Sequence, residues 1–270
     1  MRAGGSLRRR RIVLFLAPAW AVALTNPAAQ AACDSPLLGT GQVSAILDAR
    51  TLRLDDGREV RLSGIEIPTF AEPAGIAWLR DYALRQAINL HGNDEAPDRY
   101  GRQHAFVFLN GGDATIQSAL VRDGHAVVSG ATSDKACARE LKEAELRAET
   151  ARLRVWSQPG LVLDAAATSD ILKYIGRFAL VEGTILSARQ AGATLYLNFN
   201  RRRIQGFAVT VSRRMMPSFA AAGLTAAALT GQRVRVRGWI SQHDGPRIEA
   251  RAPGQIELVN DTRTAAAGGK

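Results

Sequence analysis

The sequence has 270 residues, 46% of them hydrophobic, and a formal net charge of +10. Five of the positive charges belong to arginines within the first 31 residues, so the other 239 residues carry only +5. This balance is mildly basic, and charge alone does not indicate a nucleic-acid-binding protein. The hydrophobic content is sufficient for one or two packed domains.

Residues 1–31 have the pattern of a cleavable signal peptide. Arg2 and the run Arg8–Arg11 are basic, about a dozen mostly apolar residues follow from Ile12 to Leu24, and Ala29-Gln30-Ala31 gives a small-x-small cleavage pattern. The apolar stretch is shorter than the roughly 20 residues that cross a bilayer, and Pro18 interrupts it. We therefore expect no stable membrane span, and a protein that is periplasmic or secreted after signal-peptide cleavage.

The route of export stays open, because an Arg-Arg pair directly ahead of the apolar run also suits a twin-arginine signal. Lipid attachment at Cys33 is disfavoured, since no large aliphatic residue stands three positions before it. Cys33 and Cys137 are the two cysteines of the chain. In an oxidising compartment they are expected to form one disulfide; the alternative is a buried thiol and a frayed terminal one.

The first predicted unit mixes strands and helices. A strand from Gln42 breaks at Asp48–Arg50, continues through Leu52 and Leu54, and returns after a hairpin turn at Asp55–Gly57. Pro73 opens a helix with one apolar face, made of Ile76, Leu79, Ala83 and Ala87. Strands at 88–90 and 105–109 come next, followed by a short helix with Asp113 as its N-cap and Gly124 after its end.

The longest predicted helix begins at a cap near Ser133 and ends at Trp156. Its apolar positions recur in steps of four and three residues, at Cys137, Leu141, Ala144, Ala148, Ala151 and Val155. This spacing puts Cys137 on the buried face, where it can meet the N-terminal segment.

A second unit is expected from about Asp170. Three strands (178–187, 194–199, 204–211), a helix (217–229) and two strands (234–240, 248–259) follow one another, which is the element order of an OB-type barrel. We therefore predict a mainly β, α+β chain with two barrels, at 32–160 and 170–260. Residues 261–270 are predicted to be a disordered tail.

Several motifs of the first unit resemble the staphylococcal nuclease (thermonuclease) family over about residues 40–157. They are Leu47–Leu52, Val60–Pro68, Asp98–Arg102, Leu120–Gly124 and the long helix ending in Trp156. The resemblance implies an OB-fold barrel with three helices that cleaves DNA and RNA using one calcium ion. It assigns Arg61, Arg102 and Glu66 to catalysis, and Arg61, Arg102 and Tyr100 to phosphate binding. Two guanidinium groups suit a phosphoryl group whose charge grows in the transition state.

The metal half of this site departs from the family pattern. In Asp48-Ala49-Arg50-Thr51, Arg50 stands in place of a calcium-binding carboxylate, and Glu66 is the only residual ligand. The catalytic glutamate falls at Thr69, and a pocket tyrosine falls at Gly130. Glu72 could substitute as a base, but it stands beside Pro73, where it suits a helix cap. Calcium requires several oxygen ligands, so we expect no metal cofactor.

The retained arginines have alternative interpretations. Arg61 and Arg102 could be scaffold residues paired with Glu66 and Asp98. Arg50 could pair internally with Asp48 or Glu66, or donate to a bound phosphate. The internal pair is favoured because a cation beside an orphan carboxylate relieves its burial.

Other residue types offer less. The four histidines (His91, His104, His125, His243) lack metal-ligand spacing, and His104 is expected to point outward. In the second unit, Arg201–Arg203 and Arg213-Arg214 with Tyr196, Phe199 and Phe207 could bind single-stranded nucleic acid. The alternative is a solvated turn beside core aromatics.

Three function hypotheses follow. The first is an exported protein that binds phosphate or nucleic acid without ordinary calcium-dependent phosphodiester hydrolysis. The second is an active phosphodiesterase with a rearranged site. The third is a module that binds another protein of the cell envelope.

Overall fold

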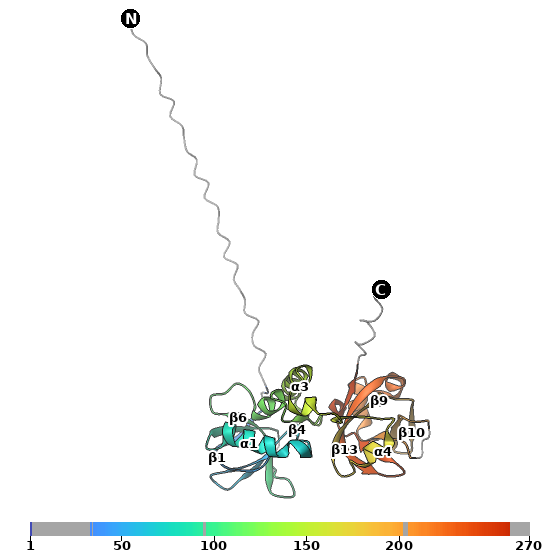
Figure 1. Ribbon diagram of the computed structural model, residues 1–270, viewed down its shortest axis with the longest axis horizontal. Coiled ribbons are helices and arrows are strands. Elements are labelled where there is room, and N and C mark those ends of the chain that lie inside the picture. The colour runs from blue at the N-terminus through green and yellow to red at the C-terminus, as the bar shows by residue number, and fades with distance from the viewer. Residues whose placement is uncertain (2–32, 34, 94–95, 202–204, 260–270) are drawn as a thin grey trace. The chain divides into compact units, whose positions relative to one another are not determined.

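The computed structural model describes residues 1, 33, 35–93, 96–201 and 205–259. The predicted signal peptide beyond Met1 and the predicted tail lie outside the described residues, so both stay predictions. No helix in the described part of the chain is both long enough and apolar enough to cross a membrane. The described fold is α+β with mostly strands (Figure 1).

Five strands of the first unit close into a barrel in the order β1-β2-β3-β6-β5. They are β1 (Leu37–Asp48), β2 (Thr51–Leu54), β3 (Glu59–Leu62), β5 (Ala87–His91) and β6 (Arg102–Leu109). The long strand β1 pairs with β5 over its first half and with β2 over its second half. Gly57, at φ +87°, makes the tight turn from β2 to β3 as predicted.

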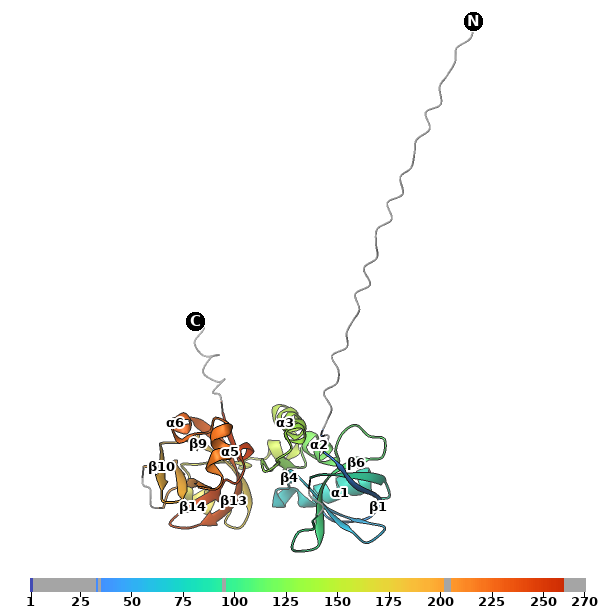
Figure 2. The same ribbon diagram turned by 180° about the vertical axis from the view of Figure 1, so that it is seen from behind.

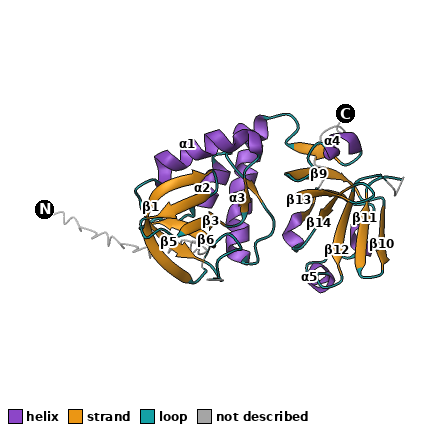
Figure 3. Ribbon diagram, turned by 90° about the horizontal axis from the view of Figure 1, so that it is seen from below, coloured by secondary structure: helices purple, strands orange, loops and turns teal. Residues whose placement is uncertain are grey.

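Three helices accompany the barrel: α1 (Glu72–Ala83), α2 (Ile116–Arg122) and α3 (Lys135–Thr150) (Figure 3). Alternate strand residues such as Val43, Leu52 and Leu90 pack with the buried helix faces in one core. In α3, Cys137, Leu141, Ala144 and Ala148 are buried, as their spacing predicts.

Some predicted boundaries are wrong. The side chain that caps α2 belongs to Thr115, which accepts from the N–H of Ser118 at 3.0 Å, and not to Asp113. The cap of α3 agrees with the prediction of a cap near Ser133: it is the neighbouring residue, Asp134. Ala87 belongs to β5 and is exposed, because α1 already ends at Ala83. The predicted long helix also stops early, and Trp156 lies in the 3₁₀ helix η2 (Arg154–Ser157).

A small two-stranded sheet lies beside the barrel and is central to the site. It consists of β4 (Ile65–Glu66) and β7 (Val127–Val128), with Ile65 paired to Val128 and Glu66 to Val127. The 3₁₀ helix η1 (Thr69–Ala71) follows β4 and leads into α1.

The disulfide between Cys33 and Cys137 is confirmed. Both cysteines are buried in the barrel core. Ser35, two residues further along, donates its hydroxyl to Asp134 Oδ2 at 2.7 Å. The beginning of the described chain is thereby attached to the start of α3.

The second unit contains an eight-stranded sheet in the order β10-β11-β12-β14-β13-β9-β8, with β15 also paired to β13. Its strands are β8 (Val162–Asp164), β9 (Phe178–Thr184), β10 (Ser187–Ala191), β11 (Thr194–Asn198), β12 (Ala208–Ser212), β13 (Arg233–Gln242), β14 (Pro246–Glu249) and β15 (Ile256–Leu258). Strand β8 begins before the predicted boundary at 170. The predicted order of three strands, a helix and two strands is wrong in number: four strands (β9–β12) precede the helices α5 and α6, and three (β13–β15) follow them. Closure into a second barrel is not confirmed.

Short helices accompany this sheet. They are α4 (Thr168–Leu172), α5 (Met216–Ala221), α6 (Ala226–Leu229) and the 3₁₀ helix η3 (Pro253–Gln255). Figure 2 shows α5 and α6 beside the sheet. The single helix predicted at 217–229 is therefore divided. Gly223, at φ +77°, ends its first half, and Thr225 caps its second half.

Candidate functional site

A cavity of about 340 Å³ lies where the barrel meets the β4–β7 sheet. Arg50, Arg61 and Glu66 line it, together with His104 from β6. Another wall is formed by Ser129 and the segment 131–134. The cavity thus gathers residues from two of the sequence motifs, Leu47–Leu52 and Val60–Pro68, whereas Arg102 and Tyr100 are not among its lining residues.

Arg50 and Glu66 form an ion pair inside this cavity. Arg50 stands in the turn between β1 and β2, where its backbone N–H donates to Asp48 Oδ1 at 2.7 Å. Its Nη1 also donates to the carbonyl of Ile65 at 2.7 Å. Burial raises the pKa of Glu66, and the positive charge of Arg50 opposes that rise. The internal ion pair expected of Arg50 is therefore confirmed, with Glu66 as the partner.

Arg61 on β3 pairs with Asp48 and not with Glu66, so that part of the scaffold interpretation is wrong. Arg61 Nη1 lies 3.1 and 2.9 Å from the two oxygens of Asp48, and 2.6 Å from the hydroxyl of Thr51. Thr51 in turn donates to Asp48 Oδ2 at 2.9 Å. Burial, and next the charge of Arg50, lower the pKa of Arg61, although a guanidinium stays protonated at neutral pH.

Arg102 and Asp98 form the scaffold pair that the sequence allowed. Arg102 Nε and Nη2 donate to Asp98 Oδ2 at 2.9 and 2.7 Å. The backbone N–H groups of Tyr100 and Arg102 donate to Asp98 Oδ1. These bonds, that of the Arg102 side chain foremost, hold the pKa of Asp98 well below its usual range. Arg102 is close enough to lower the pKa of Arg61 by its charge.

Tyr100 lies on the turn before β6, with its side chain exposed. The guanidinium carbons of Arg99 and Arg102 lie 4.7 and 4.9 Å from the centre of its ring, and its hydroxyl accepts from Arg99 at 2.6 Å. Arg61 and Arg102 thus interact through their charges, and the exposed Tyr100 lies against Arg102. His104 is exposed and lies 3.4 Å from Asp98.

The donor set does not fit a calcium ion. Asp48 is bonded to Arg61 and Thr51, and Glu66 to Arg50, so a metal ion would meet two guanidinium groups. Among the described residues, no group of three or more His, Cys, Asp or Glu side chains could hold a metal. Thr69 is exposed at the start of η1. The N-cap of α1 is Ala71, and Glu72 is the first residue of the helix, so Glu72 is not the cap residue.

Gly130, the position expected for the pocket tyrosine, makes a close contact that the sequence did not predict. Gly130 has φ +72°, and a Cβ there would lie 2.4 Å from the carbonyl oxygen of Gly254 in η3. The sequence around Gly130 does not predict this contact, because the partner residue is more than 120 positions away in the chain. A tyrosine at this position is sterically excluded.

Of the two interpretations of Phe199 and Phe207 in the second unit, core packing is confirmed and base stacking is not. Both are buried in the core, with ring centres 5.1 Å apart. Tyr196 is half-buried and lines a cavity with Arg247. Arg201 is exposed, and Arg202–Arg203 lie outside the described residues.

Comparison with known families agrees with the motifs. Residues 59–158 match the family model described as staphylococcal nuclease homologue. The resemblance inferred from the sequence is confirmed for this part of the chain. A search of curated proteins found no match.

Proposed function

We propose that this protein, with its staphylococcal nuclease homologue domain at residues 59–158, is exported and binds a phosphate-containing ligand without calcium-dependent hydrolysis. Nucleic acid is the ligand class that the domain favours. The observation that carries the proposal is the Arg50–Glu66 ion pair beside Arg61 in one cavity. A cation of the chain itself stands where the family has a metal ligand.

Phosphate binding is supported by the donors in the cavity. Among the described residues, every side-chain hydrogen bond of Arg61 uses Nη1, so the rest of the guanidinium fork can meet a phosphate oxygen. Thr132 Oγ1 is buried without a partner in the described structure, and Thr132 lines the same cavity. A buried hydroxyl without a partner costs free energy, which a ligand oxygen would relieve.

Loss of calcium-dependent hydrolysis is supported by what surrounds the carboxylates. Phosphodiester hydrolysis requires an activated water in addition to stabilised charge. Thr69 cannot act as a carboxylate base, and both Asp48 and Glu66 are neutralised by arginines. Arg61 and Arg50 can stabilise a phosphate. In the described part of the chain, however, the family motifs offer no unpaired carboxylate that could activate the attacking water.

A second candidate function is phosphodiester hydrolysis by a rearranged site. One observation favours it: Glu66 lines the cavity, and its pKa is raised by burial. Carboxylates with a raised pKa beside charge-stabilising groups often transfer protons. In this mechanism Glu66 would accept the proton of the water whose oxygen bonds to phosphorus, while Arg61 stabilises the phosphoryl oxygens. The P–O bond to the leaving group would break, and the leaving oxygen would take a proton from solvent.

Calorimetric titration of residues 32–270 with a nucleoside 3′,5′-bisphosphate tests the proposal. We expect binding in the presence of a chelator, weakened at least tenfold by Arg61→Met. The matched control is Arg53→Met, which removes an exposed arginine paired with Glu59 on the neighbouring strand. Affinity unchanged by Arg61→Met would contradict the proposal.

Activity and location are measured separately. Cleavage of denatured DNA that needs calcium would contradict the leading function, whereas cleavage that survives chelation and is lost in Glu66→Gln would favour the second. Absence of both binding and cleavage would favour a module for an envelope protein. Cell fractionation of the full chain, with N-terminal sequencing of the exported form, tests export and cleavage after Ala31.

A further inference from the structure

One wall of the cavity is a short segment that follows strand β7. Ser129 and residues 131–134 line the cavity, and Val128 stands at their start. On one side, the segment is attached to strand β4, which carries Glu66: Val128 pairs with Ile65, and Ser129 N–H donates to the carbonyl of Gly64 at 2.8 Å. The position of residues 128–134 therefore affects both this wall of the cavity and the carboxylate of Glu66 on the paired strand.

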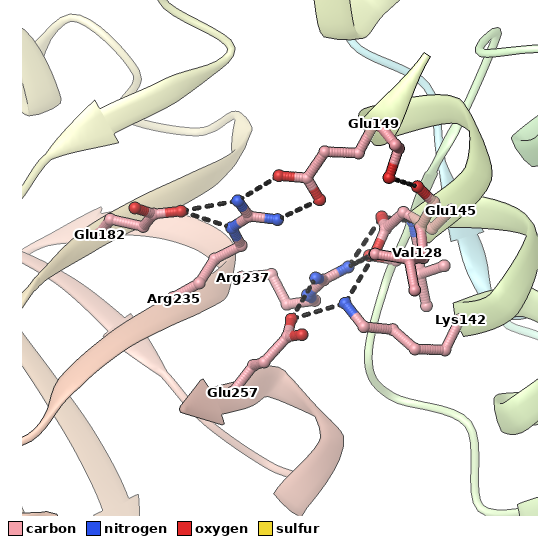
Figure 4. Close-up of polar contacts among 10 residues, drawn as sticks. Val128, Lys142, Glu145, Glu149, Glu182, Arg235, Arg237 and Glu257 are labelled. Carbon is pink, nitrogen blue, oxygen red and sulfur yellow. Dashed lines mark hydrogen bonds and ion pairs between the residues drawn. The ribbon is translucent and has the colours of Figure 1, made fainter. Parts of the chain in front are cut away.

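On the other side, the backbone of Val128 forms hydrogen bonds with two charged side chains (Figure 4). Its N–H donates to Glu145 Oε1 at 2.7 Å, and its carbonyl accepts from Arg237 Nη1 at 2.8 Å. Arg237 Nη1 also lies 2.9 Å from each oxygen of Glu145. Val128, Glu145 and Arg237 thus form a closed ring of hydrogen bonds, and the side chains of Glu145 and Arg237 are only 0% and 1% exposed.

Arg237 belongs to strand β13, far from the barrel in the sequence. Lys142 and Glu257 complete its surroundings: Glu257 accepts from Arg237 Nη2 at 3.1 Å and from Lys142 at 2.6 Å. A buried ion pair is destabilised strongly when one partner is removed, because the other charge stays uncompensated. Lys142 also lies 3.1 Å from Glu145 Oε2, so loss of Arg237 would leave the charge of Glu145 only partly compensated. It would also remove the donor to the carbonyl of Val128.

A second contact from the same region reaches the same wall. Gly130 packs against the carbonyl of Gly254 in η3, and a Cβ at Gly130 would also lie 2.9 Å from Cδ of Arg237. Gln255 ties η3 to β13 by donating its side-chain N–H to the carbonyl of Arg237 at 3.0 Å. Two separate contacts thus connect β13 and η3 to residues 128–130.

We infer that Arg237 is a positioning residue for the cavity, and that β13 with η3 forms an integral support of the site. The consequence for ligand binding rests on the proposed function, while the consequence for the wall does not. Arg237 fixes the segment 128–134 by holding both Glu145 and the carbonyl of Val128. The staphylococcal nuclease homologue domain of this chain accordingly depends on the second unit for the shape of its cavity.

Arg235 on the same strand provides a matched control. Its guanidinium donates to Glu149 at 2.8 and 2.6 Å and to Glu182 at 2.7 Å (Figure 4). It therefore also links β13 to helix α3. Its hydrogen bonds involve no residue of the segment 128–134, so removing it weakens the attachment of α3 without touching the wall.

Amide hydrogen exchange of the processed protein, residues 32–270, tests the inference in Arg237→Met and Arg235→Met. In Arg237→Met we expect exchange in 128–134 to accelerate at least tenfold, and bisphosphate affinity to fall at least fivefold. In Arg235→Met both are expected to stay as in the unsubstituted protein. If Arg237→Met does not fold, Arg237→Lys, which keeps the charge but lacks the guanidinium fork, takes its place.

Equal acceleration in both variants would overturn the inference, because Arg237 would then act only in general attachment of the two units. Unchanged exchange in the Arg237 variant would overturn it as well. Acceleration confined to that variant, in a protein that binds no bisphosphate, would support the positioning role and contradict the proposed function. Failure of the positioning role and failure of the proposed function therefore give different results.

Discussion

The guanidinium of Arg50 is ion-paired with the carboxylate of Glu66, and the two side chains are only 15% and 13% exposed. Arg50 also donates to the carbonyl of Ile65, which directly precedes Glu66. An arginine of the chain itself therefore supplies the positive charge that this carboxylate faces. Since burial of an unpaired carboxylate is costly, the pair explains how Glu66 is retained without a metal.

Arg50→Asp is expected to create calcium affinity. The change would remove the internal cation and place a third carboxylate beside Asp48 and Glu66, a set of hard oxygen ligands that suits calcium. Saturating calcium at about 100 times the dissociation constant would stabilise the variant by about 2.7 kcal/mol. Thermal unfolding with and without calcium measures this effect.

The control for this prediction is Arg53→Asp, because Arg53 is exposed on β2 and pairs with Glu59 outside the cavity. Neither this variant nor the unsubstituted protein is expected to gain stability from calcium. A calcium-dependent rise in Tm of the unsubstituted protein, or none in Arg50→Asp, would contradict the interpretation of the ion pair.

Removing the disulfide in the double variant Cys33→Ser/Cys137→Ser is expected to lower the free energy of unfolding by about 4 kcal/mol. The bond joins residues 104 positions apart, and closing so long a loop restricts the unfolded chain. Urea unfolding of the oxidised protein and of the variant measures the difference. An unchanged midpoint, or two free thiols in denatured, unreduced protein from the periplasm, would contradict the prediction.

His125 is expected to make the protein less stable in mild acid. The ring is buried near Trp78, and neither ring nitrogen has a hydrogen-bond partner within the described residues. Burial, and next the charge of Arg154, lower the pKa of His125 below its ordinary 6.5, while Asp123 opposes this. As the pH falls, the ring of His125 is therefore protonated in the unfolded chain before it is protonated in the folded protein. The stability is present above pH 6.5 and is lost as the pH falls through the lowered pKa.

Replacing His125 measures its contribution to the pH dependence of Tm. Tm should fall between pH 7.5 and pH 5 in the unsubstituted protein, and fall less in His125→Phe, which cannot be protonated. His243→Phe, at an exposed position, should behave like the unsubstituted protein. An equal loss of Tm in all three proteins would show that His125 does not carry the effect.

Gly130→Ala is expected to destabilise the protein more than Gly160→Ala does. Both glycines have positive φ, +72° and +85°, so each alanine introduces about 1 kcal/mol of backbone strain. At Gly130 the new methyl would also meet the carbonyl of Gly254, whereas nothing lies within 4 Å of one at Gly160. Overpacking of this kind adds about 1 to 3 kcal/mol. Equal free energies of unfolding in urea would contradict the close contact.

The site was only partly predictable from the sequence. Arg102 and Asp98 lie four residues apart on one turn, so their pairing follows from local geometry. The scaffold alternative paired Arg61 with Glu66, but Arg61 pairs with Asp48, because β2 and β3 place Thr51 opposite Arg61 and hold Asp48 beside it. Which acid meets which arginine depended on strand register, which residue types do not specify.

The sequence by itself determined the local features of this protein. Alternation of apolar residues specified β1 to β3, steps of three and four specified the buried face of α3, and the motifs around Arg61 and Arg102 identified the staphylococcal nuclease homologue segment. Only the tertiary structure decided that Arg50 pairs with Glu66, that Phe199 and Phe207 belong to a core, and that Gly130 meets Gly254. These outcomes depend on burial and on contacts between residues distant in the chain. Periodicity and motif spacing record only neighbours along the chain, so they carry no information about such contacts.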